Sequence, residues 1–175
     1  SWPVGIGAAL ITLPFIGETA GLVWAMILVT IVVLLGLALF YIFYREADHI
    51  PISSGTSFKI NGTALIALLL AGIIWSFYNA ALAMIFGFSP IFLMESGWTM
   101  LSASSASSIV LWLAVISIPL GGYLADKTGK KDLVIIFSLT SFSILLFASA
   151  HTEYIILIYI LIGLFAGLAA GPILA

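Results

Sequence analysis

Five charged residues stand within seven positions of an almost uncharged chain: Asp126, Lys127, Lys130, Lys131 and Asp132. Lysines can hold a loop on the cytoplasmic face of a membrane and can contact anionic lipid. An aspartate among them adds little to that anchoring, but it can accept hydrogen bonds at the N-terminus of a neighbouring helix. The stretch therefore predicts an anchored connection in which Asp126 has a conformational role.

A second polar group lies in "WSFYNA", residues 75–80, where Trp75, Tyr78 and Asn79 are three and four residues apart. This spacing places them on one face of a helix. An asparagine inside a membrane is costly unless it is paired or faces a cavity. Two interpretations stay open: contact with a substrate, or packing in which Asn79 bonds to a neighbouring helix.

The serine-rich segment "SASSASS", residues 102–108, could suggest a nucleophile. However, none of Asp, Glu, Lys, Arg or His lies within a predicted span, so no residue at that depth could act as its base. We therefore expect no catalytic residue, and we interpret the serines as a surface for close helix packing. Gly163, Gly167 and Gly171 repeat every four residues and predict a similar surface, with helix bending as the alternative.

The chain has no cysteine, and its histidines, His49 and His151, have no neighbours with metal-ligand spacing. We expect no metal site and no cofactor. No glycine-rich phosphate loop is present, which argues against a nucleotide-driven pump. Nucleic acid is not an expected partner.

The composition sets the class of protein. Hydrophobic residues make up 63% of the chain and charged residues 7%, against about 25% charged residues in soluble domains. A helix of about 20 apolar residues crosses the hydrocarbon core of a bilayer. The sequence therefore predicts an all-α, polytopic membrane protein with helices at about 1–17, 20–44, 63–86, 99–124, 133–150 and 154–175.

Polar segments divide these helices into two groups. Residues 45–62 form the longest polar connector, so we expect residues 1–44 and 63–175 to belong to two bundles. "GFSP" at 87–90 is expected to end or kink the third helix, and Asn61 or Thr63 to cap its start. All five Lys and Arg residues fall in the connectors 45–62 and 125–132, which places both on the cytoplasmic side.

The stretch "GGYLADKTGKK" resembles the loop signature of the major facilitator superfamily. The matching residues are Gly122, Tyr123, Leu124, Ala125, Asp126, Lys127, Gly129, Lys130 and Lys131. The resemblance implies a fragment equivalent to helices five to ten of a twelve-helix transporter, in which the third predicted helix lines the central cavity. The opening "SWPVGIGAAL" is similar to the cyanate and nitroimidazole branch.

The expected function is secondary transport of a small solute by alternating access. The partners would be that solute, membrane lipid and, as an open question, a coupling proton or ion. The expected location is the plasma membrane. A receptor or scaffold that does not transport is the main alternative, and an intramembrane enzyme ranks third because the chain lacks a catalytic pair.

Overall fold

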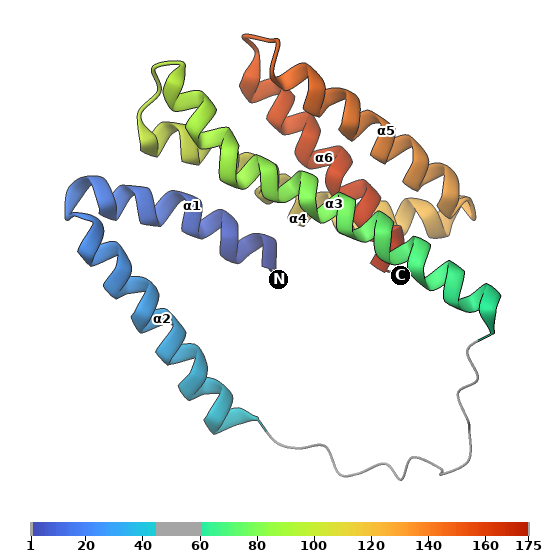
Figure 1. Ribbon diagram of the computed structural model, residues 1–175, viewed down its shortest axis with the longest axis horizontal. Helices are drawn as coiled ribbons and strands as arrows, with labels where there is room; N and C mark the ends of the chain where they lie inside the picture. Colours follow the sequence, from blue (N-terminus) through green and yellow to red (C-terminus); the bar gives the residue numbers. More distant parts are fainter. Residues whose placement is uncertain (1, 45–60, 175) are drawn as a thin grey trace.

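The computed structural model describes residues 2–44 and 61–174, which form six helices and no strand (Figure 1). Most of the predicted connector 45–62, including Arg45, His49 and Lys59, lies outside the described residues. The helices are α1 (Trp2–Thr19), α2 (Leu22–Phe43), α3 (Gly62–Glu95), α4 (Met100–Thr128), α5 (Lys131–Ser149) and α6 (Ile155–Leu174).

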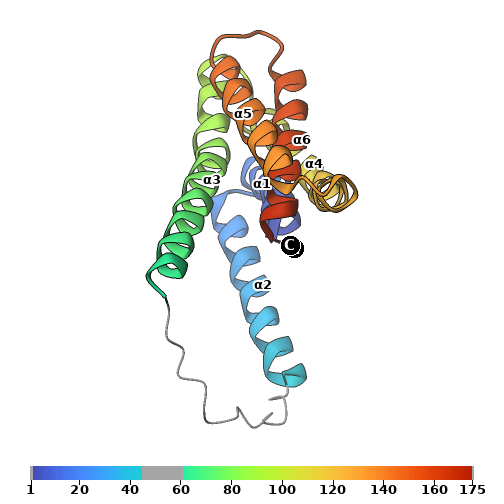
Figure 2. The same cartoon turned by 90° about the vertical axis from the view of Figure 1, so that its right-hand side faces the viewer.

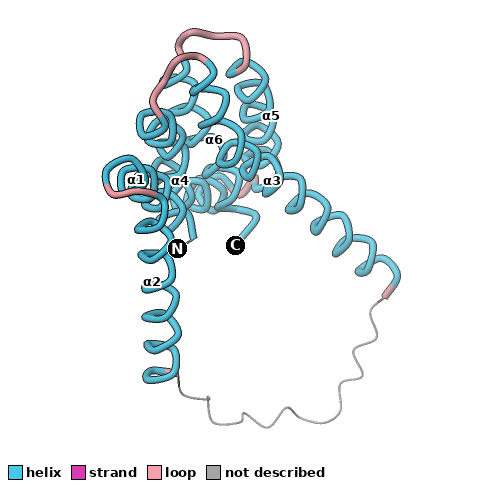
Figure 3. Tube along the Cα trace, turned by 60° about the vertical axis from the view of Figure 1, so that its left-hand side comes forward, coloured by secondary structure: helices cyan, strands magenta, loops and turns pink. Residues whose placement is uncertain are grey.

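Five of these helices, α2 to α6, are long and apolar enough to cross a membrane, and α1 is a shorter apolar helix. The chain is therefore a multi-pass membrane protein by the length and composition of its helices. Large apolar side chains cover most of the outer surface. On α2 only Ala25 is buried, and this helix extends away from the others (Figures 2 and 3). Such a surface suits lipid or further helices.

The centre of the fold is the parallel packing of α4 against α6. Gly163, Gly167 and Gly171 of α6 lie against successive turns of α4, near Val110, Ala114 and Ile118, respectively. A methyl group on Gly163 would lie 2.6 Å from the carbonyl oxygen of Val110. The backbones can approach this closely because these positions have no side chain. The predicted packing role of the repeated glycines is confirmed.

Serines of α4 occupy the same buried surface. Ser107 and Ser117 are fully buried. The Ser117 hydroxyl lies 2.9 Å from the carbonyl oxygen of Leu113 and 3.0 Å from that of Gly163 on α6. The hydroxyl of Ser107 donates to Ala103 of its own helix. Within the serine-rich segment Ser104, Ser107 and Ser108 are buried, so this segment serves helix packing, as predicted.

Helix α1 packs antiparallel against α4. Gly7 lies beside Leu111 and Trp112, and near the other end of the interface the backbone N–H of Leu101 donates to the Glu18 carboxylate over 3.0 Å. An N–H in the first turn of a helix has no partner within that helix. Glu18 satisfies this one, and its negative charge is favourable at the helix N-terminus.

Helix α3 is longer than predicted. It continues through "GFSP" to Glu95, although Pro90 has no N–H to donate to the helix ladder. Of the two outcomes expected at 87–90, an end of the helix is wrong, because the next turn continues and closes on Ser96 and Gly97. A kink at this point stays a prediction. At its start, Asn61 caps the helix by accepting a hydrogen bond from the N–H of Thr63 over 3.2 Å, so Asn61 is the cap of the two residues expected.

The signature stretch is helical for most of its length, which corrects the loop expected at 125–132. Helix α4 runs to Thr128 and α5 begins at Lys131, so only Gly129 and Lys130 connect them. Gly129 has a positive φ of 65°, which a glycine adopts without steric cost. Asp132 lies in the first turn of α5, where the helix dipole favours a negative charge.

The two adjacent glycines of this stretch have different surroundings. A methyl group on Gly121 would overlap the backbone of Leu168 on α6, whereas one on Gly122 would meet nothing within 4 Å. We expect Gly121→Ala to destabilise the bundle by about 1–3 kcal/mol through overpacking. The matched variant Gly122→Ala should be neutral or more stable, because alanine favours a helix by roughly 0.5–1 kcal/mol.

Denaturation of the two variants in detergent, followed by circular dichroism, measures this difference. Equal stabilities for Gly121→Ala and Gly122→Ala would contradict the close approach of α4 and α6 at Gly121.

Candidate functional site

The aromatic residues of the predicted polar face meet one another on α3. The rings of Trp75 and Tyr78 are stacked with their centroids 5.5 Å apart. Tyr78 is only 4% exposed, and its hydroxyl donates to the carbonyl oxygen of Ala166 on α6 over 3.0 Å. Its ring also contacts Phe142 of α5. The hydroxyl of Tyr78 is therefore engaged in holding α3 to α6.

Asn79 and Trp75 keep part of their hydrogen-bonding capacity. The side-chain N–H of Asn79 donates to the carbonyl oxygen of Trp75 over 2.7 Å, within the same helix. Its side-chain oxygen accepts no hydrogen bond from the described residues, and the indole N–H of Trp75 donates none to them. Both side chains are half-buried. An acceptor and a donor are thus available on one face of α3.

A chain of three hydroxyl groups joins the C-terminal half of α3 to α4 and α6. The Ser89 hydroxyl lies 3.0 Å from that of Ser107 on α4, and it is also hydrogen-bonded to Tyr159 of α6. Tyr159 is 3% exposed. No Cα atom of α3 lies within 8 Å of one of α6, so the side chains of Tyr78 and Tyr159 bridge the two helices.

A cavity and a groove lie along the interface between α3 and the helices α5 and α6. One, of about 290 Å³, is lined by parts of all three helices and includes the hydroxyl-bearing residues Ser89, Ser149 and Tyr159. The other, of about 270 Å³, is an apolar groove between α3 and α5 that includes Tyr78 and Phe142. Both spaces remain because the backbones of α3 and α6 stay apart and only side chains join the two helices.

The signature residues Asp126 and Lys127 lie exposed on the last turns of α4. The Asp126 carboxylate forms no hydrogen bond or ion pair with the described residues, so the predicted contact with a helix N-terminus is not formed here. The Lys127 ammonium lies 5.6 Å from the centre of the Tyr123 ring, a cation–π geometry. It also lies where the α4 dipole favours a positive charge.

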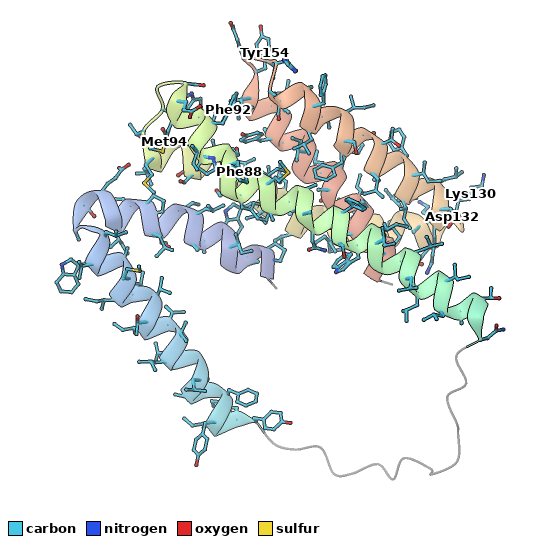
Figure 4. All side chains as sticks on the ribbon, viewed as in Figure 1. Phe88, Phe92, Met94, Lys130, Asp132 and Tyr154 are labelled. Carbon is cyan, nitrogen blue, oxygen red and sulfur yellow. The ribbon has the colours of Figure 1, made fainter. Side chains whose placement is uncertain are left out.

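Opposite ends of the helices differ in charge. Lys130 and Asp132 lie at one end, far from Met94 and Tyr154 at the other (Figure 4). We call the first the lysine end, which contains the α4–α5 connection and the start of α3. The second is the acidic end, which contains Glu18, Glu95 and Glu153 beside the ends of α1, α3 and α5, respectively.

Sequence reasoning did not find the hydroxyl chain of Ser89, Ser107 and Tyr159. One signal was present, because Tyr159 lies four residues before Gly163 and so continues the face of α6 that packs against α4. Ser89 belongs to "GFSP", the segment expected to end or kink the third helix.

No described protein family, curated protein or solved structure matches this chain.

The hydroxyl of Tyr78 gives a direct test of how α3 is held. We expect Tyr78→Phe to lower the free energy of unfolding by about 0.6–1.5 kcal/mol, because one buried interhelical hydrogen bond is lost while the ring contacts remain. Tyr154→Phe is the matched control, since Tyr154 is 76% exposed. Unfolding in detergent measures both, and equal stabilities would remove the Tyr78 hydroxyl from the interface.

Proposed function

We propose that this protein is a secondary transporter of a small solute, working by alternating access in the plasma membrane, with its lysine end in the cytoplasm. The proposal is supported by residues 122–131, whose sequence resembles the major facilitator signature, and by the positions that these residues occupy. A polytopic protein with almost no charge inside its helices is compatible with this class.

The observation that carries the proposal is the placement of two acidic groups at opposite ends of α4. At the lysine end, Asp126 is exposed and has no partner among the described residues. At the acidic end, Glu18 of α1 accepts a hydrogen bond from the first turn of α4. Helix α1 belongs to the first of the two expected groups of helices and α4 to the second. The two groups can therefore rock against each other when the contact of one acidic residue forms and that of the other breaks.

In this proposal the structure is an inward-open conformation. It is closed at the acidic end, which faces outward, by the Glu18 contact, and the contact of Asp126 at the inner end is not formed. A major facilitator protein exposes its site to each side in turn. Glu18 would therefore favour the inward-open state, and Asp126, when it meets a helix N-terminus, the outward-open state.

The proposed solute contacts are Trp75 and Asn79. Their unused indole donor and amide acceptor could bind a polar solute that offers both an acceptor and a donor. Tyr78 would position this face of α3, because its own hydroxyl is already bonded to Ala166. A coupling proton or ion would need groups at the ends of the described helices or outside them, because the helix interiors contain none of Asp, Glu, Lys, Arg or His.

Uptake measurements on the full-length protein test this site. Asn79→Ala should reduce uptake of a transported solute by about three- to tenfold, the effect of losing one hydrogen bond, with normal amounts of inserted protein. Ser76→Ala is the matched control, because Ser76 also bonds a carbonyl four residues earlier on α3 but is exposed. A panel of radiolabelled neutral and anionic solutes in proteoliposomes provides the assay. Unchanged uptake per inserted Asn79→Ala molecule would assign Asn79 to packing.

Alternating access is tested by the labelling of a single cysteine at position 79, since the 175 residues contain no other thiol. Glu18→Ala should raise the ratio of outside to inside labelling by up to about fivefold, because an anion at a helix N-terminus contributes roughly 0.3–1 kcal/mol. Asp126→Asn should lower the same ratio.

Glu153→Ala is the control for Glu18→Ala, since Glu153 lies at the same end and its carboxylate bonds none of the described residues. If neither Glu18→Ala nor Asp126→Asn changes the ratio, a non-transporting receptor or scaffold becomes the better interpretation.

A further inference from the structure

The cavity of about 290 Å³ between α3, α5 and α6 is separate from Trp75 and Asn79, neither of which lines it. Its walls are apolar apart from Ser89, Ser149 and Tyr159. Its volume is at the low end of small-molecule sites, which begin at roughly 300 Å³. Phe88 and Met84 at its edge are 65% and 58% exposed, so the cavity can be reached from the surrounding membrane.

The hydroxyl protons of Ser89, Ser107 and Tyr159 can be assigned one by one. Each hydroxyl has a single proton. Ser107 donates its proton to the carbonyl oxygen of Ala103 over 2.9 Å. For all the bonds of the chain to form at once, Ser89 therefore donates to Ser107. Tyr159 then donates to Ser89. All three protons are used inside the protein, in one direction, from α6 through α3 to α4.

The wall of the cavity is therefore left with acceptors. The Tyr159 hydroxyl donates to Ser89, but its oxygen accepts no hydrogen bond from the described residues. Ser149 donates its proton to the carbonyl oxygen of Leu146 over 2.7 Å, and its oxygen likewise accepts no hydrogen bond within the described part of the chain. A molecule that enters the cavity finds no hydroxyl proton available to it.

We propose that this cavity binds a small neutral amphiphile, an apolar body with one hydroxyl group, which enters from the membrane and donates its proton to Tyr159 or Ser149. The apolar walls match the body of such a molecule, and the two unused acceptors select a donor. A neutral alcohol fits better than a cation, because no carboxylate lines the cavity and a buried unpaired charge is costly. This site is independent of the transport proposed above.

Photolabelling tests the proposal on the full-length protein in lipid nanodiscs. The probes are an eight-carbon alcohol that carries a diazirine and its methyl ether, which has the same body but no proton to donate. We expect the alcohol to label cavity residues such as Phe88 about three- to tenfold more than the ether, the preference that one hydrogen bond gives. Mass spectrometry locates the labelled residues.

Two variants reduce this preference for different reasons. Tyr159→Phe removes one acceptor and also the bond to Ser89, whereas Ser149→Ala removes an acceptor that bonds only its own helix and so leaves the interhelical contacts intact. Ser143→Ala is the matched control, because Ser143 makes the same kind of bond on α5 and does not line this cavity.

The proposal holds if the alcohol preference falls in Tyr159→Phe or Ser149→Ala and persists in Ser143→Ala. Equal labelling by alcohol and ether in the parent protein would overturn it, as would a preference that survives in both cavity variants. If Tyr159→Phe fails to fold, Ser149→Ala alone decides the outcome.

Discussion

The close approach of α4 and α6 is the constraint on which the rest of the structure depends. Inside a membrane the apolar surface of one helix gains little by leaving lipid for another, so helices associate through close packing and hydrogen bonds. Gly163, Gly167 and Gly171 allow that packing, and Ser117 adds a hydrogen bond to the Gly163 carbonyl. Helices α1 and α3 are then placed by their own contacts with α4.

Helix α3 is held in a different way, and the hollows of the protein follow from it. Its backbone stays away from that of α6, and the long side chains of Tyr78 and Tyr159 cross the distance. The space beside those side chains is what remains as cavity and groove. On the side that faces α5 and α6, α3 is held by a few side chains and loses fewer contacts when it moves than it would if packed backbone to backbone. This suits the helix that carries the proposed solute contacts.

Among the described residues the charges lie at or beside the ends of the helices, and several of them act on helix termini. Lys127 and Asp132 each lie where the dipole of their own helix is favourable. Glu18 serves the N-terminus of a different helix, so it links α1 to α4. Contacts of this last kind depend on how two helices are arranged, and they are the ones on which the proposed alternation relies.

The sequence by itself determined the membrane class, the existence and order of the helices, and the pair of residues, Asn61 and Thr63, of which one caps α3. These follow from hydropathy and from residues that act on their immediate neighbours. It could not decide that Gly121 rather than Gly122 contacts α6, that Tyr78 bonds Ala166, or that Ser89 joins Tyr159. Those pairs lie 47 to 88 residues apart, from Gly121 and Leu168 to Tyr78 and Ala166. Helical periodicity fixes which face of a helix a residue occupies, whereas only the packing of the helices decides which neighbour that face meets.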